Sequence, residues 1–331
     1  MGMTVLGAGS WGTALAIQLC RAGHSVMLWG RDPEHAREMA ETRENRRYLS
    51  GFHLPPPLAP TADLAQAVRS ANELLVVAIP SHGVREAMEA ARAHIHAEAV
   101  ICSAAKGIEE GTSKRMSEVI AEASGCGDRV SVLTGPSFAR EVAAERPTAV
   151  MAAAANEETS QFVQHAFASP MFRVYASEDP VGAEVGAAVK NVIAIAAGVS
   201  DGLGLGHNTR AAIITRGLAE VNRLAIKLGA DPLTVTGLAG MGDLVLTCTG
   251  ELSRNRSVGI KLGQGEKLSE ILESMSQVAE GVRNTIAVDE LAKSAGVEMP
   301  ITTQMRCLLF EDKAPREAMV ALMTRQLKHE F

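Results

Sequence analysis

The chain has 331 residues, of which 47% are hydrophobic and 21% charged, and its formal net charge is −6. This composition is typical of a folded protein, and the length predicts two domains rather than one core. The negative charge and the lack of a Lys/Arg-rich block argue against a nucleic-acid partner. The five cysteines are scattered and form no CxxC pair, which predicts a cytoplasmic protein. No residues have the spacing of metal ligands, and no apolar stretch reaches membrane length, so neither a bound metal nor membrane insertion is expected.

Short β-branched runs alternate with Ala-rich helical patterns over the first 180 residues. Strands are expected at 3–7, 25–30, 73–80, 99–107, 129–135, 148–154 and 172–177, and helical spacing occupies 11–22 and 81–95. Continuous apolar strands joined by helices predict a largely parallel, doubly wound sheet. The Pro-rich segment GFHLPPPLAP, residues 51–60, is expected to be a surface loop.

The strand signal ends near residue 180. Helical patterns follow at 181–199, 208–228, 257–263 and 281–295, with a Gly-rich turn expected around 237–243. We therefore predict an α/β, Rossmann-like dinucleotide-binding domain over residues 1–180. An all-α substrate-binding domain is expected over residues 181–331.

The segment TVLGAGSWG places Gly7, Gly9 and Gly12 in GxGxxG spacing. The spacing follows an expected strand and opens an expected helix, which is the context that a dinucleotide-binding turn requires. Gly7 permits a tight turn, Gly9 lets the backbone approach a pyrophosphate, and Gly12 lets helix and strand pack closely. The amides of Ser10 and Trp11 at the start of the helix would stabilise the phosphates.

The end of the second expected strand, LWGRDP, bears on the choice of cofactor. An arginine at this place suits the 2′-phosphate of NADP, whereas a carboxylate suits the ribose hydroxyls of NAD. Arg31 therefore favours NADP(H), and the adjacent Asp32 keeps NAD(H) open.

A lysine and an asparagine interrupt the apolar run EVGAAVKNVIAIAAG, residues 184–198. On a helix, Lys190 would lie among small apolar residues, and charged side chains are rarely buried without a partner. One interpretation is a lysine that crosses the helix rim with its ammonium in water. The other is a functional lysine: small apolar neighbours would desolvate its ammonium, lower its pKa and let it act as a general acid/base.

Six further segments carry a resemblance: VAIPSH (77–82), AAKGIE (104–109), TGPSFAREVA (134–143), AVKNVIAI (188–195), GLAGMGDLVLTCTG (237–250) and LSRNRSVG (252–259). With GAGSWGTALA at the start, the chain closely resembles the bacterial NAD(P)-dependent glycerol-3-phosphate dehydrogenases, from residue 3 to past residue 300. The resemblance implies reversible reduction of dihydroxyacetone phosphate to sn-glycerol 3-phosphate, which supplies glycerophospholipid biosynthesis. The sequence does not settle the oligomeric state, for which a homodimer is the candidate.

The resemblance also implies site residues. Lys190 is then the catalytic acid/base and a substrate contact, with Asp243 as its partner and Thr247 one helical turn further on. The other implied substrate contacts are Lys106, Gly135, Ser137, Asp243, Ser253, Arg254 and Asn255. Besides the Gly-rich turn and Arg31, the implied cofactor contacts are Lys106, Ala139, Arg254, Val278 and Glu280. Simpler interpretations stay open: an ordinary turn for GPS, a solvated loop for SRN, and helix caps for Asp243 and Glu280.

Two other functions remain open. A 6-phosphogluconate or β-hydroxyacid dehydrogenase also joins a Rossmann domain to a helical domain with a Lys-Asn pair, but TGPSFA and LSRNR argue against it. A redox sensor that binds NADP without turnover has no need for a proton donor, so Lys106, Lys190 and Asp243 argue against that function.

Overall fold

The computed structural model describes residues 2–275, 279–327 and 329–330. The chain divides into two compact units, Met1–Glu109 with Lys114–Glu184 and Glu110–Ser113 with Val185–Phe331. This division falls inside helix α8 (Pro180–Gly202). The predicted domain boundary between residues 180 and 181 stays a prediction.

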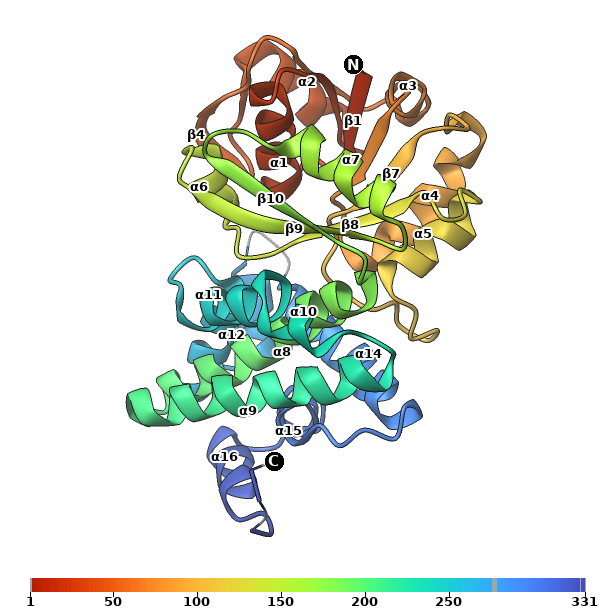
Figure 1. Ribbon diagram of the computed structural model, residues 1–331. Coiled ribbons are helices and arrows are strands. Elements are labelled where there is room, and N and C mark those ends of the chain that lie inside the picture. Colours follow the sequence, from red (N-terminus) through yellow and green to blue (C-terminus); the bar gives the residue numbers. More distant parts are fainter. Residues whose placement is uncertain (1, 276–278, 328, 331) are drawn as a thin grey trace. The chain divides into compact units, whose positions relative to one another are not determined.

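An eight-stranded sheet forms the first unit, in the order β10-β9-β8-β7-β6-β1-β2-β5 (Figure 1). Its strands are β1 (Gly2–Leu6), β2 (Ser25–Trp29), β5 (Leu58–Thr61), β6 (Leu74–Val77), β7 (Val100–Ser103), β8 (Val130–Thr134), β9 (Thr148–Ala154) and β10 (Phe172–Ser177). Neighbouring strands pair in parallel except β8 and β9, which are antiparallel. From β5 to β8 the spatial order is 3-2-1-4-5-6 in chain order, as in doubly wound dinucleotide-binding folds. The predicted α/β fold class is confirmed.

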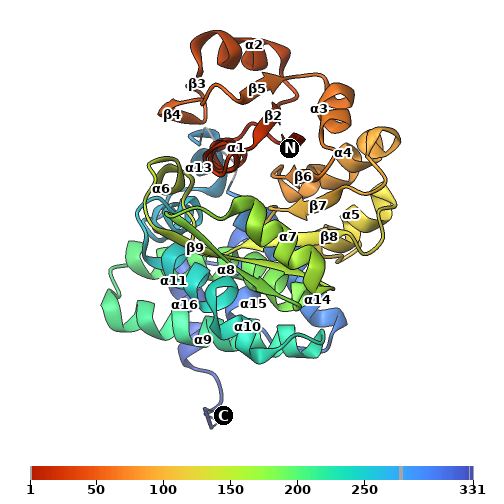
Figure 2. The ribbon, with the colours of Figure 1, turned by 45° about the horizontal axis from the view of Figure 1, so that its top comes forward.

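Helices cover both faces of this sheet (Figure 2). One face carries α1 (Ser10–Arg21) with α6 (Ala139–Ala143) and α7 (Glu157–Phe167), and the other carries α3 (Leu64–Ser70), α4 (Val84–Ala91) and α5 (Met116–Ser124). Short helices η1 (Ser81–Gly83) and η2 (Arg92–His94) flank α4, and α2 (Pro33–Thr42) packs against β5. Each face has its own apolar cluster, one including Leu15 and Phe167 and the other including Met88 and Ile120.

The segment 51–60 differs from its prediction. It holds the end of β4 (Leu49–His53), which forms a hairpin with β3 (Glu44–Asn45), and most of β5. β5 pairs in parallel with β2, with Pro60 opposite Leu28. The loop prediction was therefore wrong for residues 51–53 and 58–60, whereas residues 54–57 form an irregular turn. Proline is excluded from central strands but tolerated at a sheet edge, where β5 lies.

The second unit is helical wherever the structure assigns it regular elements. After α8 it contains α9 (Gly206–Lys227), α10 (Pro232–Thr236), η3 (Leu238–Gly242), α11 (Asp243–Thr249), α12 (Arg254–Gly263), α13 (Leu268–Glu273), α14 (Glu280–Ser294), α15 (Pro300–Phe310) and α16 (Pro315–Met323). The Gly-rich turn expected at 237–243 is a π-helical turn, η3, that leads directly into α11.

Helix α8 is the centre of this unit. It is long and apolar enough to cross a membrane, but 94% of its most apolar stretch is buried inside the protein, as in a core helix. Its backbone touches that of α12, because a Cβ atom on Gly259 would lie only 2.1 Å from the carbonyl oxygen of Ile195. Gly198 and Gly202 on α8 face α12 in the same way. This close packing fixes the start of α12 relative to Lys190.

Candidate active site

The Gly-rich turn connects β1 to α1, and its three glycines are used differently. Gly7 has a φ of +116°, and a Cβ atom there would lie 2.5 Å from the carbonyl oxygen of Ala78. A Cβ on Gly12 would lie 1.9 Å from the carbonyl oxygen of Gly7, whereas a Cβ on Gly9 would meet nothing within 4 Å. Gly7 and Gly12 are therefore required by the fold, and Gly9 leaves the turn open to a ligand.

The start of α1 fits an anionic group. Its N-cap residue is Gly9, no side chain caps the helix, and the positive end of the helix dipole favours a phosphate at this place. The indole Nε1 of Trp11 is buried and has no hydrogen-bond partner among the described residues. Buried donors are normally paired, so this N–H calls for an acceptor from a ligand or water.

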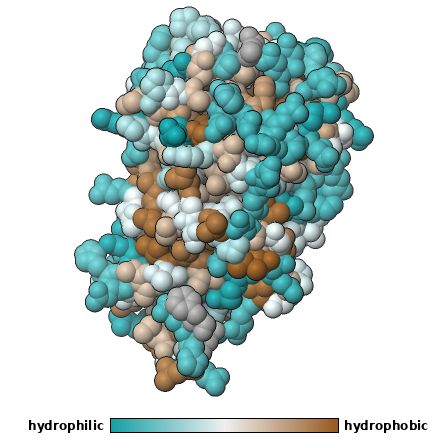
Figure 3. Space-filling model, viewed as in Figure 1, coloured by the Kyte–Doolittle hydropathy of each residue, from teal (hydrophilic) through white to brown (hydrophobic). Residues whose placement is uncertain are grey.

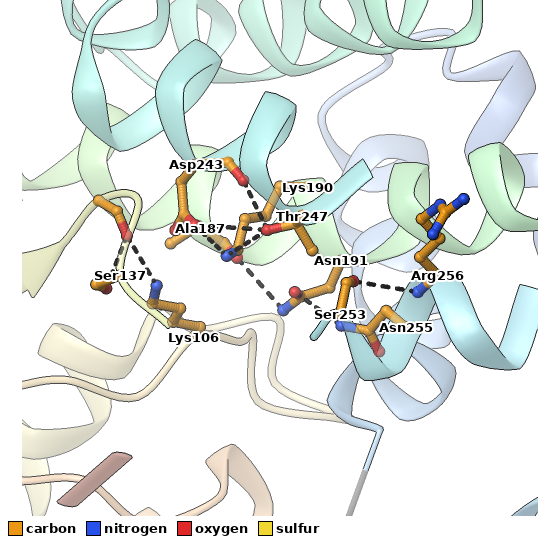
Figure 4. Close-up of polar contacts among 11 residues, drawn as sticks. Lys106, Ser137, Ala187, Lys190, Asn191, Asp243, Thr247, Ser253, Asn255 and Arg256 are labelled. Atoms are coloured by element: carbon orange, nitrogen blue, oxygen red, sulfur yellow. Dashed lines mark hydrogen bonds and ion pairs between the residues drawn. The ribbon is translucent and has the colours of Figure 1, made fainter. Parts of the chain in front are cut away.

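Four further predicted residues of this unit follow the carboxyl ends of β7 and β8. Lys106 Nζ donates a hydrogen bond to the carbonyl oxygen of Gly135 at 3.3 Å, and Ser137 Oγ donates to the same oxygen at 2.9 Å (Figure 4). The Lys106 ammonium also lies 5.8 Å from the centre of the Trp11 ring. Gly135 has a φ of +140°, which an L-residue rarely adopts. Ala139 begins α6 and packs against the apolar cluster of α1.

Asp32 follows the carboxyl end of β2 and caps α2. Its Oδ1 accepts hydrogen bonds from the backbone amides of Glu34 and His35 at 3.0 and 3.2 Å, and its Oδ2 accepts from Arg47 Nη1 at 3.1 Å. These hydrogen bonds hold the pKa of the Asp32 carboxyl below its usual value. The His35 amide contributes most, and the Glu34 amide and Arg47 contribute less. Arg31 is exposed to solvent beside it.

Lys190 lies inside the helical unit and is only 5% exposed. Its Nζ donates to Asp243 Oδ1 at 2.5 Å and to Thr247 Oγ1 at 3.0 Å (Figure 4). The Thr247 hydroxyl donates its own proton to the backbone carbonyl of Asp243 at 2.6 Å, so it can only accept from the lysine. The rim interpretation of Lys190 is therefore wrong, since its ammonium is buried and paired.

Asp243 is the first residue of α11, and the N-cap residue, Gly242, makes no side-chain capping bond. The Asp243 side chain is 2% exposed and faces Lys190. The helix-cap interpretation of Asp243 is wrong as well. A carboxylate buried to this degree needs a charged partner, and the lysine provides it.

Asn191, next to Lys190, joins a chain of buried amides. Asn255 donates through Nδ2 to Asn191 Oδ1 at 2.9 Å and accepts through Oδ1 from the backbone amide of Gly281 at 3.0 Å. Asn284 Nδ2 donates to the carbonyl oxygen of Ala188 at 3.2 Å. These bonds connect α12 and α14 to α8 and fix the orientation of the Asn255 amide. At most one hydrogen of that amide can point at a substrate.

The SRN segment opens α12. Ser253 is 4% exposed and caps the helix by accepting a hydrogen bond from the backbone amide of Arg256 at 3.3 Å. Arg254 stays accessible to solvent. The protein around Arg254 still removes part of the water from its guanidinium, and this desolvation lowers the pKa of the group. The carboxylate of Glu280 acts in the opposite direction. Glu280 occupies the first turn of α14, and the predicted cofactor contact Val278 lies outside the described residues.

Sequence reasoning missed Asn45, which is fully buried. Its Nδ2 donates to the carbonyl oxygen of Ala8 at 2.9 Å and to Thr13 Oγ1 at 2.8 Å, and its Oδ1 accepts from the backbone amide of Tyr48 at 3.1 Å. The residue thus fastens the β3–β4 hairpin to the Gly-rich turn. A single asparagine in a polar stretch carries no spacing signal, so the sequence alone could not have identified it.

A cavity of about 370 Å³ lies elsewhere in the helical unit, among α14, α15 and α16. It is lined by Asp289, Lys293 and Arg325 among others, and by none of those predicted site residues that the structure describes. It therefore does not mark the active site.

The two units define a class of protein. A doubly wound sheet with an open Gly-rich turn, in one chain with a helical unit that buries a Lys–Asp–Thr cluster, is the architecture of a nicotinamide-dinucleotide-dependent dehydrogenase. The family models for the N-terminus and the C-terminus of NAD-dependent glycerol-3-phosphate dehydrogenase match residues 2–160 and 179–320. The chain belongs to this family, as its sequence motifs predicted.

Similar proteins agree over the whole chain. Glycerol-3-phosphate dehydrogenase [NAD(P)+] of Geobacter sp. strain M21 is 56% identical over 330 residues, covering 99% of this chain and 98% of that protein. The enzyme of the same name from Anaeromyxobacter dehalogenans is 52% identical over 333 residues and the full length of both. The crystal structure of glycerol-3-phosphate dehydrogenase from Coxiella burnetii superposes with a TM-score of 0.94 at 41% identity, covering 98% of each chain.

Proposed function

We propose that the protein catalyses the NAD(P)-dependent, reversible reduction of dihydroxyacetone phosphate to sn-glycerol 3-phosphate. The buried contact of Lys190 with Asp243 and Thr247 is the observation that carries this proposal within the family. When bound, the nicotinamide supplies the hydride in one direction and accepts it in the other. The protein has to hold the substrate and move one proton.

Lys190 is the group that moves the proton. Reduction of a ketone places negative charge on its oxygen, and a positioned ammonium both stabilises that charge and donates a proton. Asp243 and Thr247 fix the direction of the lysine Nζ, and the Asp243 carboxylate balances its charge where both side chains are buried. In the reverse direction, the neutral amine takes the proton from the substrate hydroxyl.

Arg254 is assigned to the substrate phosphate. Its guanidinium can form two parallel hydrogen bonds to a phosphate, and it lies in the first turn of α12, where the helix dipole also favours an anion. Ser253 and Asn255 flank it, and their bonds to Arg256, Asn191 and Gly281 hold this turn in place. Lys106, Gly135 and Ser137 keep the substrate role that the resemblance implies, and Lys106, Ala139 and Glu280 keep the cofactor role.

The test is the oxidation of NADPH and of NADH by purified protein, followed by nicotinamide absorbance. Dihydroxyacetone phosphate should support turnover, whereas 6-phosphogluconate with NADP+ and small β-hydroxyacids with NAD+ should not. Turnover with either of the latter but not with dihydroxyacetone phosphate would point to the rival dehydrogenases. Nucleotide binding without turnover on any substrate would point to the sensor.

The proposal extends to the setting of the enzyme: the cytoplasm, where its product supplies glycerophospholipid synthesis. A homodimer is the proposed assembly. Apolar side chains gather on the surface of the helical unit (Figure 3). Among the apolar residues of this unit, Leu233 and Met323 are 77% and 81% exposed. Such surface often marks contacts between proteins. Sedimentation velocity across a range of protein concentrations should show a dimer, and a monomer at every concentration would contradict this part.

A further inference from the structure

The β3–β4 hairpin lies beside the nucleotide-binding turn. Asn45 bonds Ala8 in the Gly-rich turn and Thr13 in α1, and it also accepts from the backbone amide of Tyr48. His35 in α2 contacts the same Asn45 side chain at 3.0 Å. These contacts hold residues 45–48 against both the turn and the start of α2. Arg47 lies within this held segment.

Arg47 meets the end of β2. Its Nη1 donates to Asp32 Oδ2 at 3.1 Å, and its guanidinium lies 5.3 Å from the centre of the Tyr48 ring. Asp32 directly follows Arg31, at the strand end that faces the adenosine ribose in doubly wound folds. The side chain of Arg47 is 57% exposed, so a ligand can reach its remaining donors.

Both carboxylate oxygens of Asp32 accept hydrogen bonds from the protein. One of its oxygens caps α2 and the other receives Arg47. A carboxylate held in this way neutralises one of the two arginines and leaves the positive charge of the other. The strand end therefore suits a dianionic phosphate better than a pair of neutral ribose hydroxyls.

We propose that Arg47, positioned by Asp32, is a second specificity-determining residue that binds the 2′-phosphate of NADP(H) together with Arg31. The proposal rests on the proposed function, since it concerns the nucleotide of that reaction. Arg47 provides a forked donor set in a fixed orientation, and Asp32 serves as its support rather than as a ribose ligand.

Isothermal titration of the full-length protein with NADPH and with NADH tests this without substrate. Arg47→Ala should weaken NADPH binding roughly tenfold more than NADH binding, because only NADPH carries the 2′-phosphate. Arg47→Lys should recover part of the loss, since it keeps the charge but not the fork. Arg46→Ala is the matched control: Arg46 is the neighbouring exposed arginine and pairs with Glu44 instead. It should leave the ratio of the two affinities unchanged.

Asp32→Asn gives an independent result, because asparagine can still cap α2. It should leave NADH binding unchanged and weaken NADPH binding, because the Nδ2 group of the asparagine cannot accept the hydrogen bond from Arg47. A tenfold loss of NADH affinity in this variant would identify Asp32 as a ribose ligand and overturn the assignment. Equal losses of NADPH and NADH in Arg47→Ala, or no loss of either, would also overturn it. If the unmodified protein bound neither nucleotide, the proposed function itself would fail.

Discussion

Replacing Lys190 by methionine separates its chemical role from its structural one. From the sequence, this change is expected to spare folding, because methionine keeps the apolar stem of the lysine. The structure reverses that expectation. The Lys190 side chain is 6% exposed and its partner Asp243 is 2% exposed, so methionine would leave a carboxylate buried without its counter-ion. Removing one partner of such a pair costs about 3–5 kcal/mol of unfolding free energy.

The variant Lys190→Met/Asp243→Asn removes both charges and serves as the control. It should regain about 2 kcal/mol of stability relative to Lys190→Met, because no unpaired charge remains buried. Turnover should fall on the order of a hundredfold or more in both variants, the usual scale for the loss of a proton-transfer group. The assays are urea unfolding and NADPH oxidation with dihydroxyacetone phosphate. Near-normal turnover in a folded variant would refute the acid/base role, and a fully stable Lys190→Met would refute the ion-pair reasoning.

Three further changes probe other parts of the molecule. Arg254→Ala should raise the KM for dihydroxyacetone phosphate strongly and Arg254→Lys should restore only part, and an unchanged KM would exclude the phosphate role. Gly259→Ala should destabilise the protein by about 1–3 kcal/mol in thermal unfolding, because its Cβ would lie 2.1 Å from the Ile195 carbonyl; Gly83→Ala, whose Cβ meets nothing within 4 Å, is the control. Burial raises the pKa of Glu220 to about 7. The hydrogen bonds that its carboxylate accepts from the backbone amides of Ile301 and Thr302 lower this pKa, but they do not cancel the effect of burial. The folded state therefore binds this proton more tightly than the unfolded state, so stability should fall as pH rises from about 4.5 to about 7, by about 3 kcal/mol at most. Glu220→Gln should remove this slope in urea unfolding, and an unchanged slope would show that another group causes it.

The sequence by itself determined the features that depend on residues close together in the chain. The strand–glycine–helix order around Gly7, Gly9 and Gly12 predicted the turn, because each glycine answers a local backbone requirement. The alternation of apolar strands and helices predicted the doubly wound sheet, and the helical patterns after residue 180 predicted the second unit. The ordered motifs were specific enough to predict the family.

Only the tertiary structure decided which groups meet. β5 is a strand despite its proline because it occupies the sheet edge, a position that no local pattern encodes. Lys190 and Asp243 are separated by 53 positions in the chain, and Arg47 and Asp32 by 15. Whether such pairs touch depends on how distant helices and strands pack, and burial then sets the strength of their charges. The sequence could therefore predict Lys190 as a candidate, but it could not show that the lysine is buried and paired. The burial and pairing of Lys190 depend on how distant helices pack, whereas spacing along the chain reflects only the local backbone and side-chain requirements of nearby residues.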